Sequence, residues 1–247
     1  MTTSIDLVLP VLNEEIDLGP STRKLTECLS ENLANYEWRI VIADNGSTDT
    51  TPDIAKALSD ELPNVEYRWL DQRGRGRAVS EAWLASDADV LAYMDIDLST
   101  DLNSLPGLLG AVAGGEYDIA IASRLKKGAR VIGRTRRRGF ISHAYSWLVR
   151  TVFLMGIRDF QCGFKAINRR AARDLLPLVE DPGWFFDSEL LLLAAKNGYQ
   201  ISEIPVEWTD SPDSRVRIVS TAIDDLKGLA RLRFGGLGRA RAELARR

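Results

Sequence analysis

The chain has 247 residues and a mass of 27.5 kDa, enough for one large α/β domain or two small ones. With 45% hydrophobic and 27% charged residues, the composition is typical of a globular protein and excludes a disordered or fibrous one. The two cysteines, Cys28 and Cys162, form neither a disulfide framework nor a metal-ligand pattern. The single histidine, His143, excludes a multi-histidine metal site.

The net charge of −3 conceals two basic segments on an acidic chain. Residues 124–138 contain eight Lys and Arg and no acid, and residues 227–247 contain seven against one Glu. Such clusters predict anionic partners, either phosphate groups or a lipid surface. Nucleic acid is not an expected partner, because no nucleic-acid-binding motif accompanies the clusters and the total charge is negative.

The first half of the chain alternates strand and helix patterns. We expect strands at residues 5–9, 39–43, 65–70, 90–94 and 119–122, and helices at residues 14–33, 51–62 and 77–85. This alternation predicts βαβ units and a mostly parallel sheet flanked by helices, with ligands at the carboxyl ends of the strands.

The second half is less regular. An amphipathic segment at residues 140–155 follows a Gly- and Arg-rich stretch, and we expect strands at 164–167 and 201–206 and helices at 188–196 and 219–230. We expect one domain over residues 1–234, including the amphipathic segment 139–157, and a loosely ordered basic tail over 235–247. No signal peptide is expected, and no apolar stretch reaches the ~18 residues of a spanning helix.

Asp95 and Asp97 follow the apolar strand 90–94. Two carboxylates at this spacing, where a strand ends, can both reach a divalent cation and a nucleotide above the sheet. A capped loop without chemistry is the simpler explanation, because Asp-x-Asp is a common pattern. The same residues also resemble the nucleophile motif of haloacid-dehalogenase-type phosphatases, although that motif follows the first strand of its sheet and this one follows the fourth.

Two further loops carry residues suited to a nucleotide. Gly74 and Gly76 follow the third strand, where they form a plain turn or let the backbone approach a phosphate at a helix N-terminus. Asp44 ends the second strand within a cluster of turn residues. Its carboxylate is placed to accept hydrogen bonds from a base or ribose.

Seven motifs occur in an order that resembles family 2 glycosyltransferases of GT-A fold, in particular the dolichyl-phosphate β-glucosyltransferases and other polyprenyl-phosphate glycosyltransferases. The resemblance covers about residues 5–229. The motifs are Pro10-x-x-Asn13-Glu14, Asp44-x-Gly46-Ser47-x-Asp49, Gly74-x-Gly76-x-Ala78, Asp95-x-Asp97-Leu98-Ser99, Ala122-Ser123-Arg124, Asp159-Phe160-Gln161-Cys162-Gly163-Phe164-Lys165 and Gly183-Trp184-Phe185-Phe186-Asp187-x-Glu189-Leu190.

The resemblance implies a Rossmann-like GT-A fold and a role for each matched position. Donor-binding residues would be Pro10, Asn13, Glu14, Asp44, Gly74, Gly76, Asp95, Asp97 and Gln161. Asp97 and Asp95 would hold Mg²⁺ or Mn²⁺, with Asp97 the more direct ligand. Arg124, Arg138, Ser142 and Arg215 would contact the acceptor phosphate, and Asp95, Asp97, Asp159 and Arg124 form the expected catalytic set.

The expected activity is inverting transfer of a sugar, such as glucose, from a nucleotide donor, expected to be UDP-linked, to polyprenyl phosphate. A phosphate monoester has a second pKa of about 6 and is therefore already a nucleophile near neutrality. An alcohol acceptor would instead need a general base, for which Asp187 and Asp159 are available. A soluble or protein hydroxyl acceptor and a non-catalytic binding module remain as alternatives.

The acceptor implies a location at the cytoplasmic face of a membrane. Some relatives append transmembrane helices, and this sequence shows none. We therefore expect peripheral contact with an anionic membrane surface, through the amphipathic segment and the basic tail. The mannose synthases often carry Gln two residues after the Asp-x-Asp pair. This sequence has Ser99 at that position, as the glucosyl branch does.

Overall fold

The computed structural model describes residues 2–210 and 218–246. Their central element is a seven-stranded sheet with the order β3-β2-β1-β4-β7-β5-β8. Its strands are β1 Ser4–Val11, β2 Glu37–Asp44, β3 Val65–Trp69, β4 Val90–Met94, β5 Ile119–Ser123, β7 Phe164–Asn168 and β8 Ile201–Pro205. β7 runs antiparallel to both of its neighbours, β4 and β5, whereas the other pairs are parallel. The mostly parallel sheet predicted from the sequence is confirmed.

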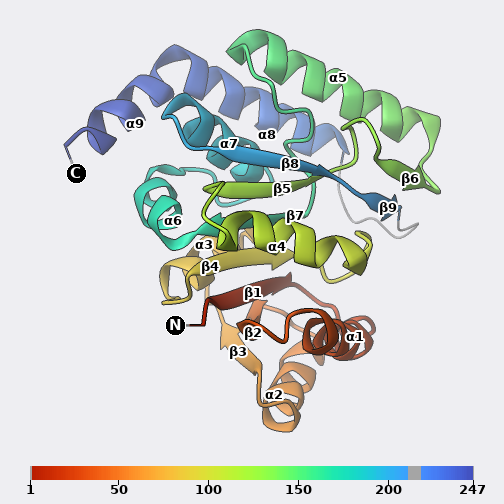
Figure 1. Cartoon of the computed structure of the whole chain (residues 1–247). Helices are drawn as coiled ribbons and strands as arrows, with labels where there is room; N and C mark the ends of the chain where they lie inside the picture. Colours follow the sequence, from red (N-terminus) through yellow and green to blue (C-terminus); the bar gives the residue numbers. More distant parts are fainter. Residues whose placement is uncertain (1, 211–217, 247) are drawn as a thin grey trace.

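Helices cover both faces of the sheet (Figure 1). They are α1 Leu18–Asn32, α2 Thr51–Glu61, α3 Arg75–Leu84, α4 Leu105–Ala113, α5 Arg136–Phe153, α6 Arg169–Leu175, α7 Phe186–Lys196, α8 Ile218–Arg231 and α9 Leu237–Leu244. A small second sheet pairs β6 Arg130–Ile132 with β9 Glu207–Thr209. None of the helices in the described residues combines the length and apolar character needed to span a bilayer.

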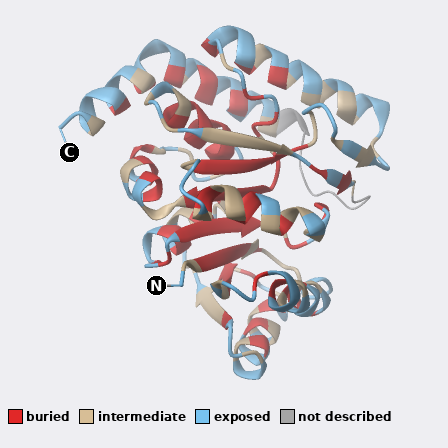
Figure 2. Cartoon of the chain, viewed as in Figure 1, coloured by how far each residue is buried: buried red, intermediate tan, exposed pale blue. Residues whose placement is uncertain are grey.

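The buried strands carry side chains into two hydrophobic clusters, one on each face. In β1, Val8 packs with α3 and α7 on one face, whereas Leu7 and Leu9 pack with α1, α2 and α4 on the other. This division follows from the period of two of an extended strand. Strands buried on both faces explain why the sequence shows continuous apolar runs there (Figure 2).

The strand order reverses between β1 and β4. β1 leads to β2 and β3 on one side of the sheet, and the chain then crosses to place β4 on the other side of β1. In an open α/β sheet the crevice at such a point, at the carboxyl ends of the strands, is where ligands bind. The loops after β1, β2 and β4 therefore meet where the sequence predicts a site.

The prediction of a loosely ordered C-terminal tail over residues 235–247 is wrong. Residues 237–244 form α9, in which Ala240 is buried and Leu237 and Leu244 pack against the same cluster as α7. The spacing of these apolar residues, three and then four positions apart, gives the helix a buried side that its basic composition conceals. The first helix also begins later than predicted, at Leu18, because the chain around Asn13 is bonded to the loop after β2.

Candidate active site

The loops after β1 and β2 are tied together by backbone hydrogen bonds to side chains. Asn13 N donates to Ser47 Oγ at 2.9 Å, and Thr48 N donates to Asn13 Oδ1 at 2.8 Å. Glu14 N donates to Thr51 Oγ1 at 2.8 Å. Asn13 adopts a left-handed backbone conformation (φ 54°), which Asn accepts more readily than most residues. The loops that carry the first two sequence motifs thus form one hydrogen-bonded rim at the carboxyl ends of β1 and β2.

Asp44 is fully buried at the end of β2, which pairs with β1 so that Ala43 lies opposite Pro10. Its carboxylate accepts hydrogen bonds from Ser47 N at 2.9 Å and from the Tyr67 hydroxyl at 3.2 Å. Burial and the neighbouring Asp44 raise the pKa of Tyr67 to about 12, which keeps that hydroxyl protonated as a donor. Asp44 therefore shapes the rim, and its contact with a base or ribose remains a prediction.

The two glycines at the start of α3 are required by packing. A Cβ on Gly74 would lie 2.5 Å from the Pro182 carbonyl oxygen, and one on Gly76 would lie 2.4 Å from Phe186 Cβ. Gly74 N donates to Asn45 Oδ1 at 2.7 Å. The missing side chains therefore admit the segment that leads into α7, and contact of either glycine with a phosphate remains a prediction.

Asp95 and Asp97 lie directly after β4, in a loop where Leu98 has φ 47°. The exposed Asp97 accepts hydrogen bonds from Ser99 N at 3.0 Å and from Ser99 Oγ at 2.7 Å. The carboxylate of Asp95 fills the space beside Gly163, where a built Cβ would lie 1.6 Å from Asp95 Oδ2. The glycine in the Gln-Cys-Gly-Phe-Lys motif thus makes room for the acidic pair.

A buried network of charges fixes Asp95 from the other side. Arg75 donates from Nε to Asp95 Oδ1 at 3.2 Å and from NH1 to Asp187 Oδ2 at 2.9 Å. Lys165, fully buried in β7, lies 2.9 Å from Asp187 Oδ1 and donates to the Tyr93 hydroxyl at 3.2 Å. Two cations and two carboxylates thus neutralise one another beneath the carboxyl end of β4.

The two carboxylates of this network have opposite pKa shifts. Burial, together with the charges of Asp97 and Asp187, raises the pKa of Asp95 against the opposing effect of Arg75. Burial also acts to raise the pKa of Asp187, but the charges of Lys165 and Arg75 outweigh it and lower that pKa. Asp187 is consequently a stable anion with both oxygens engaged.

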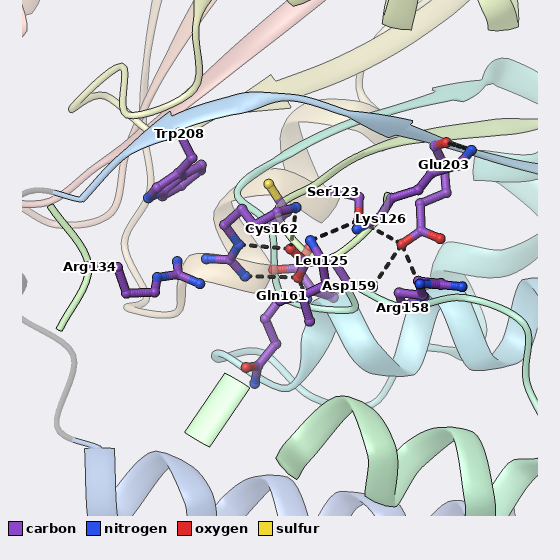
Figure 3. A network of polar contacts seen from close by, with 12 residues as sticks. Ser123, Leu125, Lys126, Arg134, Arg158, Asp159, Gln161, Cys162, Glu203 and Trp208 are labelled. Atoms are coloured by element: carbon purple, nitrogen blue, oxygen red, sulfur yellow. Dashed lines mark hydrogen bonds and ion pairs between the residues drawn. The ribbon is translucent and has the colours of Figure 1, made fainter. Parts of the chain in front are cut away.

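Arg124 forms a second buried ion pair with Asp159, which is labelled in Figure 3. Arg124 donates to Asp159 from Nε and from NH2, each at 2.8 Å, and from its backbone N at 2.9 Å. Its guanidinium also lies 4.9 Å from the centre of the Trp208 ring. Burial opposes ionisation of Asp159, but Arg124 outweighs it and the pKa of Asp159 is lowered.

The remaining predicted phosphate-binding residues lie near the start of α5. Arg138 NH1 lies 3.0 Å from Asp210 Oδ2, and Arg134 NH2 lies 3.4 Å from Asp210 Oδ1. Ser142 follows Arg138 by one turn of the same helix. Burial and the positive charge of nearby Arg124 lower the pKa of Arg134. Arg124, Arg134 and Arg138 thus lie close to one another around Asp210. Arg215 lies outside the described residues.

Gln161 connects the site to α8. Its Nε2 donates to Asp225 Oδ2 at 2.7 Å, and its side chain points away from Asp159 (Figure 3).

Sequence reasoning missed two roles in this network. It did not identify Arg75 as the partner of Asp95, nor Asp225 as the partner of Gln161. The one sequence signal for the charge network was Lys165, a cation inside an apolar strand that needs a buried partner.

The acidic pair fits a divalent cation in the chemistry of its ligand atoms. Asp95 and Asp97 supply hard oxygen ligands, and no cluster of three or more metal-ligating acidic, His or Cys side chains occurs in residues 2–210 and 218–246. A cation at the pair would therefore take its other ligands from water or a phosphate, as Mg²⁺ sites commonly do.

The fold, with an acidic pair at the strand ends, is that of a glycosyltransferase of GT-A type, and comparison with known proteins agrees. The chain belongs to glycosyl transferase family 2, whose family model matches residues 6–176. Glucosyl-3-phosphoglycerate synthase from Mycobacterium tuberculosis, in complex with Mn²⁺ and UDP-glucose, shares the fold. The TM-score is 0.68 at 18% identity, over 94% of this chain and 79% of that one.

Curated relatives extend the similarity beyond the family model. Glycosyltransferase AglD of Haloferax volcanii is 39% identical over 87% of this chain, which spans 34% of that protein's length. Dolichyl-phosphate beta-glucosyltransferase of Drosophila melanogaster is 32% identical over 86% of this chain and 69% of its own length. The enzyme of that name from Saccharomyces cerevisiae is 29% identical over 94% and 75%.

Proposed function

We propose that this chain is an inverting glycosyltransferase that moves a sugar from a nucleotide donor to polyprenyl phosphate. The donor is a UDP-sugar such as UDP-glucose, and the product is a β-linked polyprenyl-phosphate sugar. Curated relatives named dolichyl-phosphate beta-glucosyltransferase support the acceptor. A structural neighbour solved with Mn²⁺ and UDP-glucose supports the donor and a divalent cation.

The state of the buried carboxylates carries the proposal for the acceptor. Asp159 and Asp187, the two carboxylates expected from the sequence to serve a hydroxyl acceptor as general bases, are both held in ion pairs that lower their pKa values. A carboxylate in that state is a poor proton acceptor for a sugar or protein hydroxyl. The site therefore favours an acceptor that is already an anion, as a phosphate monoester is near neutral pH.

Arginines gather where such an anion would bind. Arg134 and Arg138 each contact Asp210 through one nitrogen and suit a phosphate because a guanidinium can donate two parallel hydrogen bonds. Arg124 already donates from Nε and NH2 to Asp159 and would add its positive charge and NH1. Holding the phosphate oxygen in line with the anomeric carbon supplies most of what this reaction needs. The oxygen–carbon bond to the acceptor forms as the bond to UDP breaks, so an α-linked donor gives a β-linked product.

Asp97 and Asp95 would hold the Mg²⁺ or Mn²⁺. Held there, the cation would supply positive charge to neutralise the charge that develops on the diphosphate leaving group. Arg75, which holds Asp95 through Oδ1, fixes the carboxylate orientation before the donor arrives. The Tyr93 hydroxyl donates a hydrogen bond to Asp187 and Lys165 forms an ion pair with it, and Asp187 in turn anchors Arg75.

A polyprenyl-phosphate acceptor would bring the enzyme to a membrane, and we propose that it binds there peripherally, on the cytoplasmic face. α5 begins at the proposed phosphate site and exposes Phe140 and Trp147, which are 74% and 66% exposed. Arg136, Arg137 and Arg150 are exposed on the same helix. Aromatic side chains beside cations suit the interface of an anionic bilayer.

A transfer assay tests the proposal. The protein is incubated with Mn²⁺, radiolabelled UDP-glucose and polyprenyl phosphate, and the label is partitioned between water and organic solvent. We expect label in the organic phase, lost on adding EDTA, with a product mass equal to that of the lipid phosphate plus one hexose less one water. Label transferred only to a water-soluble or protein acceptor would contradict the proposed acceptor. Absence of transfer from UDP-glucose and from every other nucleotide sugar used in its place would contradict the enzymatic function.

A further inference from the structure

A pocket of about 420 Å³ lies between α8 and the segment that leads into α7. Gly183, Trp184 and Phe185 line one side, and Thr221 and Asp225 line the other. Trp184 is 45% exposed and therefore offers apolar surface to a ligand. This pocket lies apart from the arginines proposed to bind the acceptor phosphate.

Asp225 is the unusual residue of this pocket. It is 4% exposed, and its Oδ2 accepts the hydrogen bond from Gln161. Its Oδ1 is buried and has no hydrogen-bond partner among the residues that the structure describes. An unpaired buried carboxylate oxygen costs free energy, so such an atom calls for an explanation. Burial and the nearby carboxylates Asp181, Asp224 and Asp187 raise the pKa of Asp225 to about 6.

Other charged groups around the pocket have partners. Asp224 lies 3.3 Å from Lys227 Nζ, and Arg231 lies 2.8 Å from Glu189. Asp181 Oδ1 accepts a hydrogen bond from Gly183 N at 2.8 Å. With Lys227 and Arg231 among its lining residues, the pocket is not a purely acidic cation site. What it offers is one buried hydrogen-bond acceptor beside an aromatic ring.

One chain of contacts and one short stretch of sequence connect the pocket to the acidic pair. Trp184 lies 5.1 Å from the guanidinium of Arg75, which holds Asp95. Gln161 lies two residues before Gly163, which packs against Asp95. A donor whose diphosphate lies at Asp95 and Asp97 can therefore direct its sugar toward Gln161 and Asp225.

We propose that Asp225 and Gln161 together bind a hydroxyl group of the donor sugar and so discriminate the sugar nucleotide from the free nucleotide. This inference rests on the proposed use of a nucleotide sugar. A neutral hydroxyl supplies the hydrogen that Asp225 Oδ1 lacks, whereas a phosphate would be repelled by the carboxylate. The exposed apolar surface of Trp184 suits the apolar C–H face of a sugar ring.

The test measures binding without any acceptor. Calorimetry with Mn²⁺ gives the Kd values of UDP and UDP-glucose for the wild-type chain and for Asp225→Asn. We expect the variant to bind UDP-glucose about tenfold more weakly, the size of effect typical of a hydrogen bond to a charged group, and to bind UDP within twofold of wild type. Asp224→Asn, the neighbouring carboxylate paired with Lys227, is the matched control and should change neither Kd.

Stability separates this role from a structural one. Because Asp225 is a buried carboxylate with a raised pKa, removing its charge should leave the melting temperature at pH 8 unchanged or higher. Gln161→Leu, which removes the partner, should weaken UDP-glucose binding in the same way. A lower melting temperature with equal weakening of both ligands, or unchanged binding of both, would overturn the inference. Wild-type protein that binds no UDP-sugar would instead overturn the proposed function on which it rests.

Discussion

Asp97 is the exposed member of the acidic pair, and its carboxylate oxygens are oriented by Ser99. Asp97→Asn keeps the shape of the side chain and removes its charge, so we expect transfer to fall by a factor on the order of 10²–10³. Asp101→Asn is the matched control, because Asp101 caps the short turn Leu102–Ser104. Turnover with saturating Mn²⁺ measures both. Near-normal turnover in Asp97→Asn would remove it from the metal site.

Gly163 shows how one missing side chain supports the acidic pair. In Gly163→Ala the added methyl group would overlap the Asp95 carboxylate, so we expect a loss of about 1–3 kcal/mol in unfolding free energy and a large loss of activity. Gly156→Ala is the control, because no atom lies within 4 Å of the Cβ position there. Thermal melting and Mn²⁺ titration of the activity give the two readouts. Equal behaviour of the two variants would contradict the packing argument.

Arg138 tests the acceptor phosphate separately from the donor. We expect Arg138→Gln to raise the KM for polyprenyl phosphate about tenfold and the KM for UDP-glucose less than twofold, because a charged hydrogen bond to one substrate is lost. Arg137→Gln changes the same charge at the exposed neighbouring position and should leave both KM values near wild type. Equal effects on both substrates would exclude Arg138 from the acceptor site.

The sequence located the acidic pair and the two arginines of the basic segment, but not what surrounds them. Asp95 and Asp97 were found because they directly follow a short apolar strand. Arg75 was not identified as the partner of Asp95, because no local pattern relates residues on α3 and after β4. Asp225 was missed because on an amphipathic helix it is indistinguishable from the exposed Asp224 beside it.

Among the elements, α5 differs most from an ordinary surface helix. Its buried side rests on Val149 and Phe153, yet Phe140 and Trp147 are largely exposed. We expect the double variant Phe140→Ser, Trp147→Ser to reduce co-sedimentation with anionic vesicles several-fold. Each substitution removes apolar side-chain area that the bilayer interface would otherwise bury. Ile16→Ser, at an exposed apolar residue before α1, is the control and should sediment as wild type. Unchanged binding of the double variant would exclude α5 as the membrane contact.

Strands were easier to predict than helices. β4 has the predicted bounds because polar residues enclose a short apolar run. α4 was missed, because its sequence is apolar all round and shows no helical period. The two-stranded pairing of β6 with β9 involves three residues on each side and leaves no pattern in the sequence.

At the scale of the whole molecule, the C-terminal segment belongs to the core. Removing residues 237–247 exposes the surface that Leu237, Ala240 and Leu244 cover, so we expect a loss of roughly 2–4 kcal/mol in unfolding free energy. Arg241→Ser with Arg246→Ser removes charge alone and should leave denaturant unfolding unchanged, while weakening binding to anionic vesicles. Truncation without loss of stability would contradict the packing of α9.

Since β7 is inserted antiparallel between β4 and β5, the order of synthesis bears on when the site can form. Asp95 leaves the ribosome early, but Arg75, which holds it, is anchored by Asp187, 112 residues further along the chain than Arg75. Contacts at such separation form late, because the intervening loop must first be closed. A nascent chain that ends before β7 therefore carries both acidic residues without a site, and competence for catalysis waits for the second half to fold.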